Sequence, residues 1–542
     1  MGTVIEWYDF FVFGTLGAVI AANFTAGSES AGFIFALGAF AAGFIVRPFG
    51  ALFFGRMGDR FGRKRAFLVT ISLMGGATVA IGLLPSIQRA GIWAPALLVL
   101  MRVLQGFAMG GEYGGAAVYV AEHAAPNRRG YLTGWIQVTA AAGLVLALAT
   151  VLATRLLVGE AGLRAGGWRI PFLLSAVLLA ISLWIRASLA ESPVFQQMKD
   201  ARRVASSPLS EAFRGDNLRR ILIALVCILL AQGAVWYTAH FYAQFFLERV
   251  LKVDAQTVNI LVMLGVLISC GGYVFFGWLS DRVGRKPVML CGMIVAAAAY
   301  LPGFHSLTAY ANPGLQQASE RAPVTIFADP ADCHFQFDPF GRQTFDSSCD
   351  VARRVLADAG VPYRNVPGEA GSEARVDVAG RSVPSLSVAG LDSQQAAAER
   401  LRVGSELRAA LATAGYPLTA DASRANAGAV LAILVFFMLA SAALYGPQAA
   451  ALVELFPTRV RYTALSVPYN IGTGWIGGLL PVSAFAMVAA TGNIYFGLTY
   501  PLVFTVIGIV ATLAFFPETN GRPLAESEVE VQSIPAGGCR AL

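Results

Sequence analysis

The chain has 542 residues, of which 56% are hydrophobic and only 13% are charged, and its mean hydropathy is +0.61. A soluble globular chain carries about 25% charged residues, so this composition excludes an ordinary soluble protein and requires lipid around much of the surface. The net charge of +7 does not indicate a nucleic-acid partner, because the basic residues are dispersed over loops.

Twelve apolar runs are long enough to cross a bilayer as helices, since about 20 apolar residues suffice. They lie at residues 2–23, 31–54, 66–86, 95–121, 131–157, 171–187, 221–247, 258–279, 287–304, 427–453, 463–490 and 494–516. Lysine and arginine cluster after the even-numbered runs, which by the positive-inside rule places both termini in the cytoplasm. We expect a multi-pass protein of the bacterial inner (plasma) membrane. The first run begins almost at Met1, so either the true start lies upstream or this member is trimmed.

One pattern of eleven residues occurs twice, at an offset of 222 residues. The copies are Gly55-Arg-Met-Gly-Asp-Arg-Phe-Gly-Arg-Lys-Arg and Gly277-Trp-Leu-Ser-Asp-Arg-Val-Gly-Arg-Lys-Pro. A second pair repeats at an offset of 332 residues, because Glu122 and Arg129 match Glu454 and Arg461. The repeats indicate a duplicated chain, and the change of offset predicts that about 110 residues have entered the second half.

These observations predict six parts of the chain. They are an N-terminal six-helix bundle at 1–187, a cytoplasmic linker at 188–220, helices 7–9 of the C-terminal bundle at 221–304, a periplasmic insert at 305–425, helices 10–12 at 426–517, and a cytoplasmic tail at 518–542.

The insert is polar and contains no spanning run, and its pattern predicts a small α/β-like fold. We expect strands at 323–328 and 362–366 and helices at 348–360 and 391–414. Cys333 and Cys349 are its only cysteines. Because the insert faces an oxidising compartment, a disulfide between them is the favoured interpretation. A reactive thiol at a helix N-terminus is the alternative.

The doubled Gly-x-x-x-Asp-Arg-x-Gly-Arg-Lys loop resembles the signature of the major facilitator superfamily. Further segments resemble its metabolite:proton symporter branch, which includes carriers of α-ketoglutarate, citrate, shikimate, and proline or betaine. They are Gly2-Thr-Val-Ile-Glu-Trp-Tyr-Asp-Phe-Phe, Arg47-Pro-Phe-Gly-Ala, Arg102-Val-Leu-Gln-Gly-Phe-Ala-Met-Gly-Gly-Glu-Tyr-Gly-Gly-Ala and Glu191-Ser-Pro-Val-Phe. The resemblance implies an all-α fold of twelve transmembrane helices in two six-helix pseudo-repeats. The insert departs from the better-known members.

The doubled loop combines a carboxylate, guanidinium groups and glycines. A carboxylate at a helix end can bind arginine side chains and the positive N-terminus of a neighbouring helix. We therefore interpret the motif residues as a gate that latches the two halves on the cytoplasmic side, the alternative being that they only anchor the topology. The predicted gating residues are Gly55, Asp59, Arg60, Gly62, Arg63, Asp281, Arg282, Gly284 and Arg285.

Charged side chains also occur inside the predicted spans. Each costs about 2.5–3.5 kcal/mol on insertion scales, so it usually lines a cavity or has a partner. The candidates for proton coupling are Glu6, Asp9, Arg102 and Glu112. We expect Asp9 or Glu112 to carry the proton. Arg102 resembles the family's intramembrane arginine of helix 4, which is associated with proton coupling, and is expected to tune that proton or to pair with an anionic substrate. A fixed structural ion pair is the alternative.

Polar and aromatic side chains of several spans are candidates for substrate binding. In the seventh span, positions 232, 236 and 240 stack on one helical face. The candidates are Gln105, Gln137, Gln232, Trp236, Tyr237, His240, Tyr445 and Asn470. Packing is the alternative role for the aromatic residues. The sequence indicates no metal ligands and no cofactor.

We interpret the chain as a secondary active transporter, not an enzyme. It is expected to couple uptake of a small polar metabolite, in particular a carboxylate, to protons by alternating access. The alternatives are a zwitterionic osmolyte (proline or betaine) symporter, or a non-transporting sensor that uses the insert. The fifth span lacks the Gly-Pro motif typical of antiporters in this superfamily, which favours symport. The expected partners are the substrate, protons and the lipid bilayer, with no nucleic acid, and the expected state is a monomer.

Overall fold

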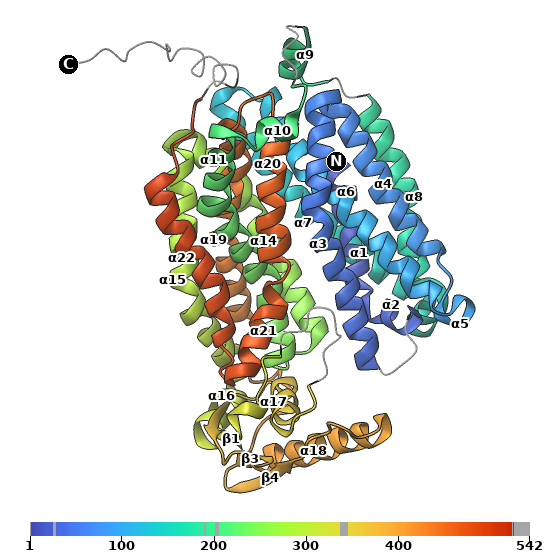
Figure 1. Ribbon diagram of the computed structural model, residues 1–542, viewed down its shortest axis with the longest axis vertical. Helices are drawn as coiled ribbons and strands as arrows, with labels where there is room; N and C mark the ends of the chain where they lie inside the picture. Colours follow the sequence, from blue (N-terminus) through green and yellow to red (C-terminus); the bar gives the residue numbers. More distant parts are fainter. Residues whose placement is uncertain are drawn as a thin grey trace, which may run out of the picture.

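The computed structural model describes residues 2–24, 29–188, 191–200, 205–336, 345–522 and 524. Long helices run side by side through most of the molecule, and a small sheet lies at one end (Figure 1). We call the end that carries residues 55–65 and 277–287 the motif end, and the opposite end the insert end. Most of the expected tail, and parts of the expected linker at 201–204, lie outside the described residues.

Within the described part, ten helices are long and apolar enough to cross a membrane. They are Arg63–Leu83 (α4), Trp93–His123 (α6), Pro126–Gly167 (η1, α7 and η2), Arg169–Ala187 (α8), Gly215–Val250 (α11 to η5), Ala255–Val283 (α14), Arg285–Ala311 (α15), Ala427–Leu455 (α19), Arg461–Thr491 (α20 to α21) and Phe496–Phe515 (η8 and α22). Three further helices occupy the positions of the first two predicted spans: α1 (Gly2–Thr15), α2 (Gly17–Phe24) and α3 (Glu29–Phe61).

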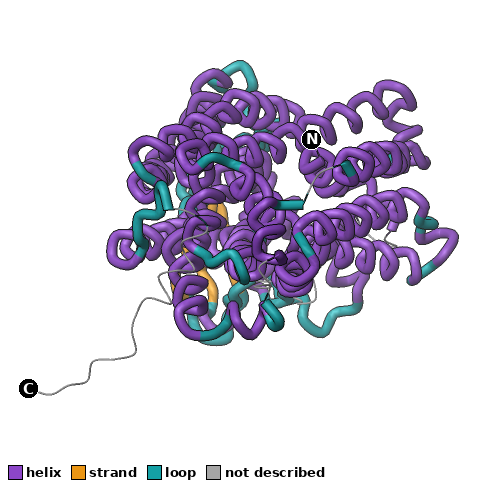
Figure 2. Tube along the Cα trace, turned by 90° about the horizontal axis from the view of Figure 1, so that it is seen from above, coloured by secondary structure: helices purple, strands orange, loops and turns teal. Residues whose placement is uncertain are grey.

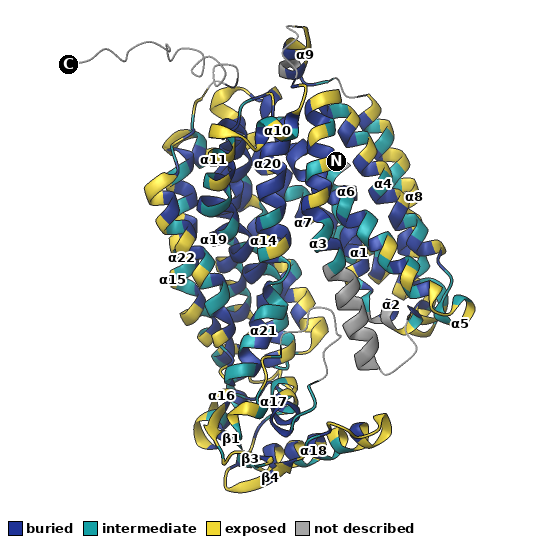
Figure 3. Cartoon of the chain, in the orientation of Figure 1, coloured by how far each residue is buried: buried dark blue, intermediate teal, exposed yellow. Residues whose placement is uncertain are grey.

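Burial along these helices is inverted relative to a soluble protein. Large apolar side chains face outward, such as Trp184, which is 76% exposed, and Val510, which is 61% exposed. Charged side chains such as Arg102 lie fully inside. Figure 3 shows how buried and exposed residues are distributed along the helices. An apolar exterior around a partly polar interior is what lipid selects.

The long helices form two bundles, which stand side by side when viewed along the helices (Figure 2). The N-terminal half contains α1 to α8, and the C-terminal half contains α11 to α15 and α19 to α22. The halves meet mainly where α3 packs on α20 and where α7 packs on α14. These contacts pair the second helix of each half with the fifth helix of the other half, as a duplicated chain requires.

The insert contains a four-stranded sheet in the order β2-β1-β3-β4. Its elements are α16 (Pro313–Arg321), β1 (Val324–Ala328), α17 (Ser348–Ala359), β2 (Tyr363–Pro367), β3 (Ala374–Val378), β4 (Arg381–Ser385) and α18 (Ser393–Thr413). β1 is parallel to β2, whereas the β1–β3 and β3–β4 pairs are antiparallel. The β3–β4 hairpin was not among the expected elements, and α15 continues to Ala311 instead of ending at 304.

The insert is attached to the C-terminal half. Tyr363 N donates to Gly492 O at 3.0 Å, and the Tyr363 hydroxyl donates to Ala489 O. Lys252 Nζ donates to Asp358 O, and Ala420 N donates to Lys252 O at 2.9 Å. These contacts fix the carboxyl end of α17 and the start of β2 to the insert ends of the seventh and eleventh spans.

Candidate functional site

The aspartates of the two loop motifs occupy equivalent positions at the motif end. Asp59 accepts hydrogen bonds from Tyr462 N at 3.2 Å and from Thr463 N at 2.9 Å, in the first turn of α20. Asp281 accepts from Gly130 N and Tyr131 N, both at 2.8 Å, in the first turn of α7. A carboxylate at a helix N-terminus is stabilised by the free N–H groups and by the helix dipole. Each half therefore caps a helix of the other.

The arginines that follow these aspartates connect them to a second set of charges. Arg63 lies 3.2 Å from Asp59 and 3.9 Å from Glu122. In the other half, Arg285 lies 2.7 Å from Asp281 and 3.2 Å from Glu454.

The repeated glutamate and arginine pairs are exchanged between the halves. Arg461 of the C-terminal half lies 2.9 Å from Glu122 of the N-terminal half. Arg129 of the N-terminal half lies 3.4 Å from Glu454 of the C-terminal half. These side chains are almost fully buried. We call the set Asp59, Arg63, Glu122, Arg129, Asp281, Arg285, Glu454 and Arg461 the ionic network. It joins the two halves at the motif end.

A third mirrored pair completes this arrangement, and sequence reasoning missed its role. Glu191 accepts from Arg63 N at 3.0 Å, and Ser192 Oγ donates to Glu122. Correspondingly, Glu518 accepts from Arg285 N at 2.9 Å, and Thr519 Oγ1 donates to Glu454 at 3.1 Å. The signal was an acidic residue followed by a hydroxyl residue after the sixth and twelfth spans.

The motif glycines allow these close approaches. Gly62 and Gly284 have φ of +107° and +106°, a conformation that side chains disfavour. A Cβ on Gly62 would lie 2.2 Å from Glu191 Oε2, and one on Gly284 would lie 2.6 Å from Glu518 Oε2. A Cβ on Gly55 would lie 2.8 Å from Thr463 Cα.

Two of the predicted gating arginines, Arg60 and Arg282, are not part of the ionic network. Arg60 and Arg282 are exposed. Each lies over an aromatic ring of its own helix, Arg60 over Phe61 at 5.4 Å and Arg282 over Trp278 at 4.2 Å.

The four predicted proton-coupling residues of the N-terminal half lie in three separate sets of contacts. Glu6 lies 2.8 Å from Arg186 of α8, and the Glu112 carboxyl comes within interaction range of Glu6 and Arg186. Asp9 accepts a hydrogen bond from Ser175 Oγ at 2.6 Å.

Arg102 has a different set of contacts from Glu112, although both lie on α6. Arg102 donates to Gln105 Oε1 at 2.7 Å, and Gln105 Nε2 donates to Thr78 Oγ1 at 2.7 Å. Its guanidinium also lies 4.1 Å from the Phe13 ring centre. The structure thus brings Arg102 together with Gln105, and Glu112 together with Glu6.

A small cavity lies beside Glu112, between the two halves. Its walls are Thr3, Trp7, Arg47, Met109, Glu112, Tyr113, Ile136, Gln137 and Tyr469. Tyr113 stacks on Tyr469 across the halves, with ring centres 3.7 Å apart, and Gln137 donates to the Tyr113 hydroxyl at 3.2 Å. Arg47, Tyr113 and Tyr469 were absent from the predicted binding residues.

The other predicted binding residues do not line this cavity. Tyr445 shares a 2.6 Å hydrogen bond with Tyr469, and Asn470 donates to Gly110 O at 2.8 Å across the halves. Trp236 donates to the Tyr273 hydroxyl at 3.3 Å and stacks on His240, whose Nδ1 lies 2.9 Å from Trp236 O.

The two remaining predicted binding residues, Tyr237 and Gln232, also lie in the seventh span. Tyr237 packs against Phe44 of the other half, with their ring centres 5.9 Å apart, and Gln232 is buried. In the described residues, no group of three or more His, Cys, Asp or Glu side chains could hold a metal ion.

The sequence profile described as "Major Facilitator Superfamily" matches residues 1–315, which is more than half of the chain. The chain belongs to this superfamily. The profile "Sugar (and other) transporter" matches residues 407–530, and the two matches lie on either side of most of the insert.

Several curated transporters of the superfamily are similar to the chain. It is 33% identical over 321 residues to the proline/betaine transporter of Escherichia coli (strain K12), a match that covers 56% of this chain and 62% of that protein. It is 36% identical over 314 residues to the shikimate transporter of the same strain, covering 57% of this chain and 71% of the relative.

Solved structures of the superfamily share the fold. A double Trp mutant of the symporter XylE superposes with a TM-score of 0.65 at 16% identity, covering 98% of this chain and 96% of that one. The glucose-analogue complex of XylE gives a TM-score of 0.60 at the same identity and coverage. The two relatives and XylE are transporters by their descriptions, and the ten candidate spans of the described residues agree with a multi-pass membrane protein.

Proposed function

We propose that the protein is a proton-coupled uptake carrier that works by alternating access between two six-helix halves, with twelve spans in total. The observation that carries the proposal is a buried glutamate pair beside a cavity between the halves, while the ionic network closes the motif end. Alternating access around a site between two repeats is the mechanism that such an architecture permits.

We assign the motif end to the cytoplasm of the bacterial inner membrane and the insert end to the periplasm. The support is the excess of Lys and Arg in the loops at the motif end, such as 56–65 and 282–286. In this orientation the predicted insert at 305–425 is a periplasmic domain. We also propose that the carrier acts as a monomer within the bilayer.

The ionic network would act as the gate on the cytoplasmic side. Opening that side must separate Asp59 from α20, Asp281 from α7, and both exchanged glutamate–arginine pairs. Because breaking a buried pair leaves charges without partners, the separated state is costly unless water replaces the contacts. The mirrored halves share these contacts, so we expect them to be released together.

The pair Glu6 and Glu112 supports a site for the coupled proton. The two carboxyls lie within interaction range of each other and of Arg186, which lies 2.8 Å from Glu6, and Arg47 also acts on Glu112. Two carboxylates buried side by side repel each other, and binding one proton at the pair relieves that repulsion. Glu112 lines the cavity and Asp9 does not, so of the two predicted proton carriers we favour Glu112.

The cavity offers partners for both signs of charge. Arg47 supplies a guanidinium for a carboxylate, which supports the carboxylate prediction. Glu112 and the rings of Trp7 and Tyr113 could hold a cationic group, since aromatic faces attract quaternary ammonium. This observation favours a zwitterionic osmolyte as the second candidate, and the named relatives include both proline/betaine and shikimate transporters.

Uptake by proteoliposomes tests the proposal. The purified protein is reconstituted with an inside-alkaline pH gradient and offered radiolabelled shikimate, 2-oxoglutarate, citrate, proline and glycine betaine. We expect gradient-dependent uptake of at least one compound. Absence of uptake for the whole panel, with binding of a panel compound by the insert, would instead support the sensor alternative.

The variant Glu112→Gln tests the coupling residue. It should retain uptake driven by a substrate gradient and lose the response to the pH gradient. The matched control is Glu160→Gln, because Glu160 is 49% exposed and pairs with Arg155 and Arg164 at the insert end. An unchanged pH response in Glu112→Gln would rule out Glu112 as the proton carrier.

A further inference from the structure

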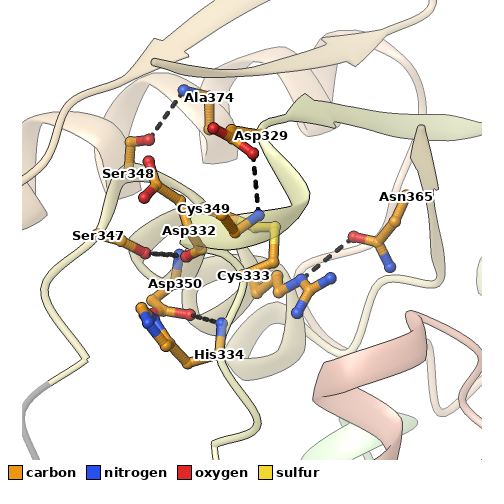
Figure 4. Close-up of a disulfide and its surroundings, with 12 residues drawn as sticks. Asp329, Asp332, Cys333, His334, Ser347, Ser348, Cys349, Asp350, Asn365 and Ala374 are labelled. Atoms are coloured by element: carbon orange, nitrogen blue, oxygen red, sulfur yellow. Dashed lines mark hydrogen bonds and ion pairs between the residues drawn. A yellow bond between two sulfur atoms is a disulfide. The ribbon is translucent and has the colours of Figure 1, made fainter. Parts of the chain in front are cut away.

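The disulfide of the insert lies at a position suited to exchange chemistry. Cys333 and Cys349 are bonded, with their Cα atoms 5.2 Å apart (Figure 4). Cys349 lies in the first turn of α17, a helix of 12 residues. The chain reaches α17 from β1 and returns in β2, which is parallel to β1. In such β-α-β units, the helix N-terminus and the carboxyl end of the strand form the usual binding edge.

The two sulfur atoms differ in access and in electrostatic surroundings. Cys349 is fully buried, whereas Cys333 is partly exposed and is followed by the exposed His334. The positive N-terminal end of a helix stabilises a thiolate. An incoming thiolate would therefore reach Cys333, and Cys349 would be the favoured leaving group.

Hydrogen bonds hold the two cysteine segments together independently of the disulfide. Before Cys333, Asp332 O accepts from Ser347 Oγ. After it, Asp350 Oδ1 accepts from His334 N at 2.9 Å, and Asp350 Oδ2 lies 2.7 Å from His334 Nδ1. Ser347 and Asp350 lie on either side of Cys349 in the sequence, so their hydrogen bonds to Asp332 and His334 flank both cysteines (Figure 4). We call these hydrogen bonds the clamp.

The first turn of α17 is also tied to the sheet. Ser348 Oγ accepts from Ala374 N at 2.9 Å, and Ser348 O accepts from Ser385 Oγ at 2.8 Å. If the disulfide served only to support the fold, it would be the main contact between the chain segments that carry Cys333 and Cys349. Here the surrounding contacts remain after the sulfur–sulfur bond is opened, so the two thiols stay close enough to reform it.

We propose that Cys333 and Cys349 form a reversible thiol–disulfide exchange site for alkyl thiols, supplied by a small thiol peptide or by a cysteine of another protein. A thiolate attacks Cys333 Sγ, the bond to Cys349 Sγ breaks, and Cys349 leaves as the thiolate. The product is a mixed disulfide on Cys333. A second thiolate then releases the first as a disulfide and leaves both cysteines reduced, while the reverse sequence reoxidises them.

The experiment uses the full-length protein in detergent without denaturant. The remaining cysteines, Cys227, Cys270, Cys291 and Cys539, are replaced by alanine. Maleimide-polyethylene glycol reports free thiols after treatment with dithiothreitol, and glutathione disulfide is then added to reoxidise the protein. We expect full reduction with little change in melting temperature, and then complete reformation of the disulfide. A pair that is reduced only in denaturant would overturn the proposal.

Single-cysteine variants identify the attacked sulfur. Cys349→Ser should trap a mixed disulfide on Cys333 with glutathione disulfide, whereas Cys333→Ser should trap at least tenfold less because Cys349 is buried. Equal trapping would contradict the assigned direction of attack. A peptide carrying one activated cysteine disulfide repeats the test, and preference for it over glutathione disulfide identifies a protein thiol as the source.

His334 is a positioning residue in this account. His334→Ala should slow reformation of the disulfide at least tenfold and leave its reduction by dithiothreitol unchanged. His334→Asn, which keeps a side-chain donor towards Asp350, should restore most of the rate. If both variants reform the disulfide as fast as the unaltered protein, the clamp does not hold the reduced site.

Discussion

At the scale of single residues, Asp59 and Asp281 perform one task in two places. Each carboxylate accepts hydrogen bonds from two successive N–H groups in the first turn of a helix from the opposite half. Each is also paired with an arginine four positions later in the sequence, Arg63 or Arg285. A positively charged loop alone would anchor the topology, but it would not require the carboxylate at this point.

The variant Asp59→Asn tests whether this contact matters for transport. The amide keeps the shape of the side chain but loses the charge that the helix N-terminus and Arg63 stabilise. A hydrogen bond to a charged group is worth about 1.5–3 kcal/mol, so we expect uptake to fall by roughly tenfold or more. Asp281→Asn is the mirrored variant and should behave alike. Normal uptake in both, with normal amounts in the membrane, would leave only the topological role.

The variant Gly62→Ala tests the close contact with Glu191. Its φ of +107° disfavours a side chain, and a Cβ would lie 2.2 Å from Glu191 Oε2, so the Glu191 carboxylate would have to move from its contact with Arg63 N. Strain of this kind costs about 1–3 kcal/mol, so we expect a lower melting temperature and reduced uptake. Gly91→Ala is the control, because Gly91 also has a positive φ of +54° but has nothing within 4 Å of its Cβ position. Equal losses in both variants would mean that backbone strain, not the contact with Glu191, is responsible.

At the scale of elements, sequence reasoning predicted what local patterns determine. The spans, the strand at 323–328 and the helix at 348–360 follow from apolar runs and capping signals, and β1 and α17 lie there. The hairpin of β3 and β4 was missed although its strands are as long as β1 and β2, and Pro384 interrupts the second strand. Ala379 and Gly380, both with positive φ, form its turn.

Packing between elements explains most of what the sequence could not show at the site. Arg102 and Gln105 are three residues apart on one helix, so their hydrogen bond is local, whereas the contact of Glu112 with Glu6 and Arg186 depends on how three helices pack. Likewise, the motif identified Asp59, while its partner in α20 depends on how the halves pack. Sequence reasoning did not recognise Glu191 and Glu518 as equivalent positions, because the number of residues between them matches neither repeat offset.

The attachment of the insert gives a prediction for Gly360, at the carboxyl end of α17. Gly360 has a φ of +70°, and a Cβ there would lie 2.1 Å from Val250 O. Gly360→Ala should therefore loosen the insert from the seventh span. Hydrogen exchange measured by mass spectrometry should rise in residues 358–366. Gly380→Ala is the matched control, since its φ is +83° and nothing lies within 4 Å. Unchanged exchange in Gly360→Ala would contradict the contact.

At the scale of the whole molecule, the two halves contact each other through charge pairs at one end and through aromatic and polar side chains farther inside. The ionic network occupies the motif end, whereas the cavity with Arg47, Glu112 and the Tyr113–Tyr469 stack lies farther inside. The insert is bonded to the C-terminal half. In the account proposed above, charge pairs set which side is closed, the glutamate pair responds to protons, and the insert moves with one half.

The most direct test of the account measures the distance across the motif end. Spin labels are placed at Asn127 and Val283, exposed positions on opposite sides of the Asp281–Gly130 contact, in protein whose unpaired cysteines have been replaced. Electron–electron resonance in nanodiscs should give one short distance for the otherwise unaltered protein. The double variant Asp59→Asn/Asp281→Asn should add a longer population, because the closed state has lost both caps. An identical short distance in both proteins would contradict the claim that the ionic network holds the motif end closed.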